Sequence, residues 1–234
     1  MNGAQARRRL YLMRHGSVDY FQPDGTPVPV DDVPLNRRGE DEARAAGELF
    51  KACGVEPDFV MTSGLPRTVQ TARHVLAAAG LERTLEADPA LQEIRPGRLK
   101  DIPHDELRRA FLGTFQSRED EVEALRFLNG ESVGELLDRV LPAFDRWLAR
   151  TDWQCGLLVL HGGVNRALLS TALAGRRAFF GRIEQAPACI NVLDIGADDL
   201  VLRAVNLTPT QWLHQRERHT TMEKLLAQFT GADA

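Results

Sequence analysis

Three short segments of the chain combine arginines, histidines and glycines. They are Arg14-His15-Gly16, Ser63 to Arg67, and His161-Gly162-Gly163. Arginine presents a planar fork of N–H donors that matches phosphate oxygens, and glycine leaves the backbone N–H approachable, as expected for Gly16 and Gly162. Such residues suit a tetrahedral dianion, and phosphate is the obvious candidate.

A histidine among these residues could also do chemistry. Imidazole is a competent nucleophile at neutral pH, and phosphoryl transfer depends mainly on positioning and on neutralising the equatorial oxygens. Arg14, Arg67 and His161 could supply that neutralisation. A leaving alkoxide also needs a proton, and Glu93 could donate it as a general acid if its loop holds the carboxyl group partly away from water.

Each of the three segments follows a predicted strand. Leu10–Met13, Phe59–Met61 and Gly156–Leu160 are short apolar runs that end near polar or glycine residues, which is typical of buried strands. Ligands of parallel sheets bind beyond the carboxyl ends of the strands. We therefore expect the three segments to meet at one edge of a sheet.

Helical spacing of apolar residues and local end signals predict the remaining elements. Ser132 and Glu135 form a capping box, and Pro66 suits the first turn of a helix. Gly54 and Gly80 are expected to end helices. The predicted helices cover 39–53, 66–79, 132–148, 164–173 and 220–229, and the further strands cover 85–87, 192–195 and 200–205.

Alternating strands and helices predict an α/β protein, a three-layer α/β/α sandwich with a mostly parallel central sheet. Residues 17–36 are rich in Pro, Asp and Gly and predict a long irregular loop. Residues 101–129 are charged with scattered Leu and Phe, and we expect them to form a helical cap insertion. The sequence has no internal repeat, so we expect residues 1–234 to form a single domain.

Five segments, in order along residues 10–195, resemble a known family, the histidine phosphatase superfamily in its phosphoglycerate-mutase-like branch (branch 1). One such segment is a weak signal, but five in the family's order are a strong one. The segments are Leu12-Met13-Arg14-His15-Gly16, Ser63-Gly64-Leu65-Pro66-Arg67-Thr68-Val69-Gln70-Thr71-Ala72, Leu91-Gln92-Glu93 with Gly97, Gly130-Glu131-Ser132, and Leu160-His161-Gly162-Gly163-Val164.

The resemblance implies a role for each matching residue. It implies that His15 is the phosphorylated nucleophile, that Arg14, Arg67 and His161 bind the phosphoryl group, and that Glu93 is the proton donor. It also implies a histidine acid phosphatase-like enzyme that needs no metal and no organic cofactor. The predicted function is hydrolysis of a small phosphorylated metabolite through a phosphohistidine intermediate.

The sequence departs from the family's pattern after the first motif. The family usually continues with Glu or Gln, Thr and, a few residues on, an Asn that touches the phosphate. Here the run is Ser17 to Phe21, and Phe21 stands about where the Asn would be. One phosphate contact is therefore missing or supplied by another residue.

Two alternatives to hydrolysis remain. Phosphoglycerate mutases that depend on a bisphosphorylated cofactor carry a Thr-Gly-Trp segment and a later tyrosine-rich segment. Residues 17–36 contain no Trp, and Tyr11 and Tyr20 are the only tyrosines, which favours a phosphatase over a mutase. A non-catalytic protein that binds a phosphorylated ligand ranks lower, because His15 and His161 are both present.

Composition limits the partners and the compartment. The 234 residues are 43% hydrophobic and 26% charged, which excludes a disordered or fibrous chain. The net charge of −4 disfavours binding of nucleic acid or an anionic membrane. The cysteines Cys53, Cys155 and Cys189 have no zinc-site or disulfide spacing. We expect a cytoplasmic protein with a small phosphorylated substrate, and a homodimer is the commonest alternative to a monomer. Residues 206–234 carry no motif.

Overall fold

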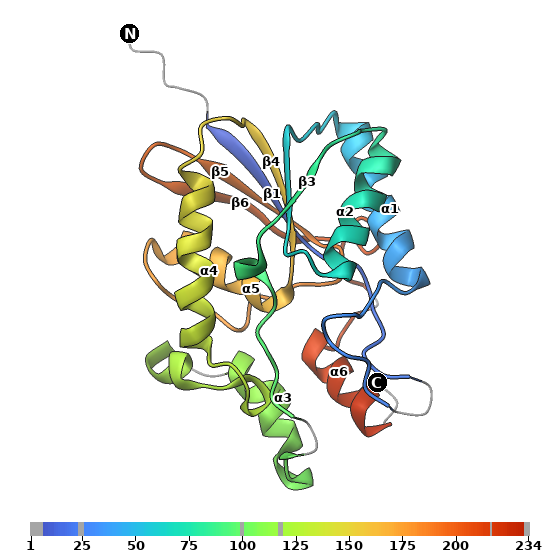
Figure 1. Cartoon of the computed structure of the whole chain (residues 1–234), viewed down its shortest axis with the longest axis vertical. Helices are drawn as coiled ribbons and strands as arrows, with labels where there is room; N and C mark the ends of the chain where they lie inside the picture. Colours follow the sequence, from blue (N-terminus) through green and yellow to red (C-terminus); the bar gives the residue numbers. More distant parts are fainter. Residues whose placement is uncertain (1–6, 23–25, 99–100, 117–118, 216, 232–234) are drawn as a thin grey trace.

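A sheet at the centre of the molecule places the three motif segments. The computed structural model describes residues 7–22, 26–98, 101–116, 119–215 and 217–231. In this part of the chain six strands form one sheet in the order β3-β2-β4-β1-β5-β6 (Figure 1). The strands are β1 (Arg8–Arg14), β2 (Phe59–Thr62), β3 (Leu85–Ala87), β4 (Cys155–Leu160), β5 (Ile190–Ile195) and β6 (Leu200–Leu207).

The sheet is mostly parallel, as predicted. β4 lies between β1 and β2 and runs parallel to both, and β2 runs parallel to β3. β5 is antiparallel to β1 and to β6, so the last two strands form a hairpin at one side of the sheet. The parallel strands bring the ends of β1, β2 and β4 to the same edge.

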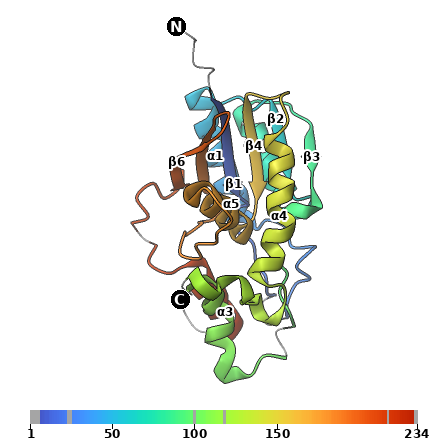
Figure 2. The same cartoon turned by 90° about the vertical axis from the view of Figure 1, so that its left-hand side faces the viewer.

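Helices cover both faces of the sheet, which confirms the three-layer arrangement (Figure 2). The helices α1 (Arg37–Cys53) and α2 (Pro66–Ala79) pack on one face, in a cluster that includes Met13 of β1. The helices α4 (Val133–Leu148) and α5 (Gly162–Ala174) pack on the other face, in a cluster that includes Leu10 and Leu12. Neighbouring residues of a strand point to opposite faces, so β1 contributes to both cores.

Local signals explain where these helices begin and end. Pro66 is the first residue of α2, and Gly80 ends it in the left-handed region at φ 73°. The Ser132–Glu135 capping box opens α4, as predicted. Gly54 ends α1 in the same way as Gly80 ends α2.

The cap insertion and the C-terminal helix lie together beyond the carboxyl ends of the strands. Most of the predicted cap is helical, with α3 (Leu107–Gln116) and short 3-10 turns at His104–Glu106, Glu119–Ala124 and Phe127–Asn129, while residues 117–118 lie outside the described residues. The helix α6 (Thr221–Thr230) packs against α3 (Figure 1). The rings of Phe111 and Phe229 stack there with centroids 5.7 Å apart.

The segment 17–36 follows β1 as an irregular loop, as predicted, and its residues 23–25 lie outside the described residues. A single bridge between Phe21 and Pro27 is its only strand-like pairing in the described part. Among the described helices, none is long and apolar enough to cross a membrane.

Candidate active site

His15 and His161 lie side by side at the carboxyl edge of the sheet. In the register of β1 and β4, Arg14 pairs with Leu160, so the residue after each strand is a histidine. Their ring centroids are 5.3 Å apart with the rings edge to face. Both side chains are buried, His15 with 1% and His161 with 0% of its surface exposed.

The backbone determines which nitrogen of His15 carries the proton. Nδ1 of His15 lies 2.8 Å from the carbonyl oxygen of Gly16, which can only accept, so Nδ1 is the donor. The lone pair therefore resides on Nε2. Burial, together with the nearby guanidinium groups of Arg14 and Arg67, holds the pKa of His15 well below 6.5. His15 is thus a neutral imidazole at pH 7, the form that acts as a nucleophile.

One ring nitrogen of His161 is hydrogen-bonded and the other has no partner in the described structure. Nε2 lies 2.7 Å from Oγ of Ser63, and the nitrogen without a partner is the buried Nδ1. When the Ser63 hydroxyl donates to Nε2, Nδ1 carries the proton and is a free donor. Burial, followed by the charge of Arg67, holds the pKa of His161 well below 6.5.

Arg14 and Arg67 are buried cations without a carboxylate partner among the described residues. Nη1 of Arg14 donates to the carbonyl oxygen of Gln185 at 2.6 Å and to Oγ1 of Thr221 at 2.9 Å. Nη1 of Arg67 donates to the carbonyl oxygen of Val30 at 2.6 Å. The Nε atoms of both arginines are buried and unpaired. Because an unpaired buried charge is costly, the two guanidinium groups favour a bound anion.

Glu93 is held at the start of α5. The N–H of Gly163 donates to both Glu93 carboxylate oxygens, at 3.1 and 3.0 Å, and the N–H of Ile94 donates to Oε1 at 2.9 Å. A Cβ on Gly163 would lie 2.5 Å from Oε1, so this approach requires glycine. Gly163 therefore leaves room for the Glu93 carboxylate, which a larger residue would displace.

Arg139 on α4 holds the loop that carries Glu93. Its guanidinium group donates to the carbonyl oxygens of Ala90, Gln92 and Glu93 and to the carboxylate of Glu131. Burial works to raise the pKa of Glu131, but the hydrogen bonds from Arg139 and from the Arg95 amide outweigh it and keep that pKa below its usual range. The role of Arg139 escapes sequence reasoning because no motif surrounds it.

The two glycines predicted to bind phosphate differ in their surroundings. The N–H of Gly16 donates to Oγ1 of Thr71 at 3.0 Å, so it is not available to an anion, which corrects the expectation. Gly16 is required for close packing instead, since a Cβ there would lie 2.4 Å from the Gly39 carbonyl oxygen. Gly162 is the first residue of α5, where the N–H has no partner within the helix, and a Cβ on it would lie 3.6 Å from Nε of Arg14.

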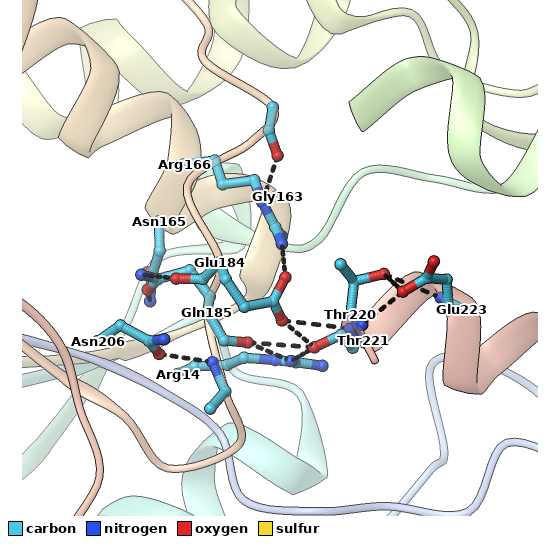
Figure 3. A network of polar contacts seen from close by, with 12 residues as sticks. Arg14, Gly163, Asn165, Arg166, Glu184, Gln185, Asn206, Thr220, Thr221 and Glu223 are labelled. Atoms are coloured by element: carbon cyan, nitrogen blue, oxygen red, sulfur yellow. Dashed lines mark hydrogen bonds and ion pairs between the residues drawn. The ribbon is translucent and has the colours of Figure 1, made fainter. Parts of the chain in front are cut away.

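A chain of polar contacts joins Arg14 to the C-terminal helix (Figure 3). Oγ1 of Thr221 accepts from Arg14 and lies 2.6 Å from a carboxylate oxygen of Glu184. The other carboxylate oxygen of Glu184 accepts from the buried Arg166 at 3.3 Å. None of Thr221, Glu184 and Arg166 was expected at the site. Arg166 lies five positions after His161, but no motif in the sequence marks it.

A cavity of about 1040 Å³ lies at the carboxyl edge of the sheet. Its lining includes Arg14, His15, Arg67, Glu93 and Gly162. Among the described lining residues, seven arginines and lysines face three carboxylates, whereas the whole chain has a net charge of −4. Three of these cations are paired with carboxylates outside the lining, which leaves four against three, so the cavity still favours anions although the protein is acidic.

Phe21, which stands near the position of the family's usual Asn, also lines the cavity, and its ring lies 5.6 Å from that of Phe229. It gives the cavity an aromatic surface in place of an amide.

The sheet topology defines an α/β protein with two buried histidines and two buried arginines near the carboxyl edge of its parallel strands. The chain belongs to the histidine phosphatase superfamily (branch 1), whose model it matches over residues 10–208. Enzymes of the phosphatase and phosphoglycerate-mutase-like kind make up its relatives, and this chain is an enzyme of that kind.

Two individual likenesses support this assignment, and a third supports the fold alone. The chain is 33% identical over 165 residues to the protein named "Probable phosphoglycerate mutase GpmB" of Enterobacter sp. (strain 638), covering 70% of this chain and 74% of that one. It resembles the alpha-ribazole phosphatase of Shigella flexneri with a TM-score of 0.66 and 27% identity, covering 85% of this chain and 96% of that one. A mycobacterial glucosyl-3-phosphoglycerate phosphatase shares the fold, with a TM-score of 0.67 and 23% identity over 86% of this chain and 98% of that one.

Proposed function

We propose that the protein hydrolyses phosphomonoesters through a phosphohistidine formed on His15 and that the reaction needs no metal ion. The observation that carries the proposal is the set of three buried nitrogen atoms without partners in the described structure, Nε of Arg14, Nε of Arg67 and Nδ1 of His161, together with a neutral His15. Positive charge and N–H groups at these positions can neutralise the oxygens of a transferring phosphoryl group.

The reaction runs in two balanced steps. In the first, Nε2 of His15 attacks phosphorus, the P–O bond to the alcohol breaks, and Glu93 gives a proton to the leaving oxygen. Arg14, Arg67 and His161 hold the phosphoryl oxygens throughout. In the second, Glu93 takes a proton from water, the water oxygen attacks phosphorus, and the P–N bond breaks to release orthophosphate and neutral His15.

Trapping the intermediate tests this proposal. The protein is mixed briefly with a 32P-labelled aryl phosphate in EDTA and quenched, and the acid lability of the protein-bound label is measured alongside turnover. We expect turnover, an acid-labile phosphoenzyme, and loss of both in His15→Ala, with kcat at least about 10³-fold lower. The matched control is His74→Ala on α2, which removes a histidine that does not line the cavity. Full turnover by His15→Ala would refute the proposal.

A mutase-type phosphotransfer is the second candidate, and the relative named a phosphoglycerate mutase favours it. A mutase uses the same groups but retains the phosphoryl group until a second alcohol accepts it. A long-lived phosphoenzyme that releases no orthophosphate and passes its label to added phosphoglycerate would support this candidate. Neither phosphoenzyme nor turnover in folded protein would instead support binding of a phosphorylated ligand without catalysis.

A further inference from the structure

Each phosphoryl-binding arginine is tied to one apolar wall of the cavity. Arg67 donates to the carbonyl oxygen of Val30, which holds the 26–36 part of the loop beside the phosphoryl position. Arg14 donates to Oγ1 of Thr221, which holds the first turn of α6, and Leu225 follows one turn later. The leaving group of an ester bound to both arginines therefore lies between two apolar walls.

These walls remain accessible to a ligand. Val30 is 40% exposed, and Tyr20, Phe21 and Leu225 are half-buried while lining the same cavity. The contact between the rings of Phe21 and Phe229 continues the aromatic surface from the loop to α6. An apolar group between the walls removes its own surface and theirs from water, which favours binding.

Three of the seven cationic side chains that line the cavity are committed to carboxylate partners. The pairs are Arg38 with Glu42, Arg166 with Glu184, and Lys224 with Glu217. A second acidic group of a substrate placed at one of these three cations would have to compete with its carboxylate partner. Arg95 and Arg98 also line the cavity, but they are exposed, where water screens their attraction for an anion.

We propose that the substrate is a phosphomonoester of a bulky apolar alcohol, aryl or alkyl, and not of a hydroxy acid or a sugar. The inference rests on the proposed phosphatase function, because it names the leaving group of that reaction. The bonds formed and broken are those of the two steps already given.

The test compares three primary alkyl esters, so that the chemistry of the leaving oxygen is matched. They are 2-phenylethyl phosphate, glycerol 3-phosphate and 3-phosphoglycerate, and the readout is kcat/KM from the initial rate of orthophosphate release. We expect kcat/KM to be at least about tenfold higher for 2-phenylethyl phosphate than for the other two esters. Equal values, or a preference for 3-phosphoglycerate, would overturn the inference.

A matched pair of variants tests the wall itself. Val30→Thr replaces a methyl group of the wall by a hydroxyl. Val205→Thr makes the same change on β6, outside the cavity. The two valines are similarly exposed, Val30 at 40% and Val205 at 38%. We expect the preference for 2-phenylethyl phosphate to fall about threefold in Val30→Thr and to stay unchanged in Val205→Thr. An unchanged preference in Val30→Thr would overturn the assignment of this wall.

Phosphoenzyme trapping separates the two ways of failing. If no ester is hydrolysed and no phosphorylated His15 is trapped, the proposed function fails and the substrate inference falls with it. If phosphorylated His15 forms from all three esters with similar kcat/KM, the phosphatase function holds and the substrate inference alone is wrong.

Discussion

Lowering the pH from 7.5 to 5.5 is expected to reduce the free energy of unfolding through His15 and His161, by at most about 3 kcal/mol. Burial holds the pKa of both imidazoles well below 6.5 in the folded protein, whereas the unfolded chain titrates them near that value. Below pH 6.5 the unfolded state binds two protons that the folded state does not. The stability from this source is therefore complete above pH 6.5 and is lost as the pH falls.

Between pH 7.5 and pH 5.5 the titration of carboxylates contributes little to the change in stability. Glu131 and Asp194, whose pKa values are lowered by folding, have ordinary values of 4.5 and 3.8, so their contribution changes little above pH 5.5. The half-buried thiol of Cys155 titrates far above the window, since desolvation raises its pKa to about 11. Each imidazole that stays neutral in the fold contributes about 1.4 kcal/mol across this window.

Urea unfolding followed by tryptophan fluorescence at pH 7.5 and pH 5.5 measures this loss. The buffer must be free of phosphate, because an anion between Arg14 and Arg67 would favour protonated histidines and flatten the dependence. The control is the double variant His15→Gln/His161→Gln, in which the dependence should nearly disappear, with each single variant losing about half. An equally steep dependence in the double variant would refute the reasoning.

Three further predictions concern the site. Thr221→Val should lower kcat/KM about tenfold, because Arg14 loses one of its two hydrogen-bond partners. The melting temperature should change little. The control is Thr230→Val, which removes a hydroxyl at the far end of the same helix and should retain wild-type activity. Gly163→Ala should lower kcat about 10²-fold with a smaller effect on KM, because its Cβ would displace Glu93; a wild-type kcat would argue against Glu93 as the proton donor. Orthophosphate should inhibit competitively. At a concentration about a hundredfold above its Kd, it should raise the free energy of unfolding by about 2.7 kcal/mol. If calorimetry shows no increase in melting temperature with orthophosphate, the anion site is contradicted.

The elements bounded by local chemistry could be predicted from the sequence. The helix α2 has the predicted bounds because the proline at its start and the glycine after its end act within one turn. The capping box of α4 is equally local. The meeting of His15 and His161 was also predictable, because parallel strands end at a common edge and each histidine directly follows its strand.

The surroundings of these residues depend on contacts between distant parts of the chain. Thr221 lies 207 positions from Arg14, and no local pattern indicates that α6 packs against α3 above the cavity. Arg139 reaches the Glu93 loop only because α4 lies beside it, and the Gly16 amide is taken by Thr71 only because α2 packs against the first motif.

The sequence by itself determined the residue types of the proposed reacting groups and the sheet edge where they gather, since composition and strand order set these. Only the tertiary structure decided which donors are left free for an anion and which side chains surround the leaving group. The physical reason is that a buried donor is free or taken according to the groups packed against it, and most of those groups come from other elements.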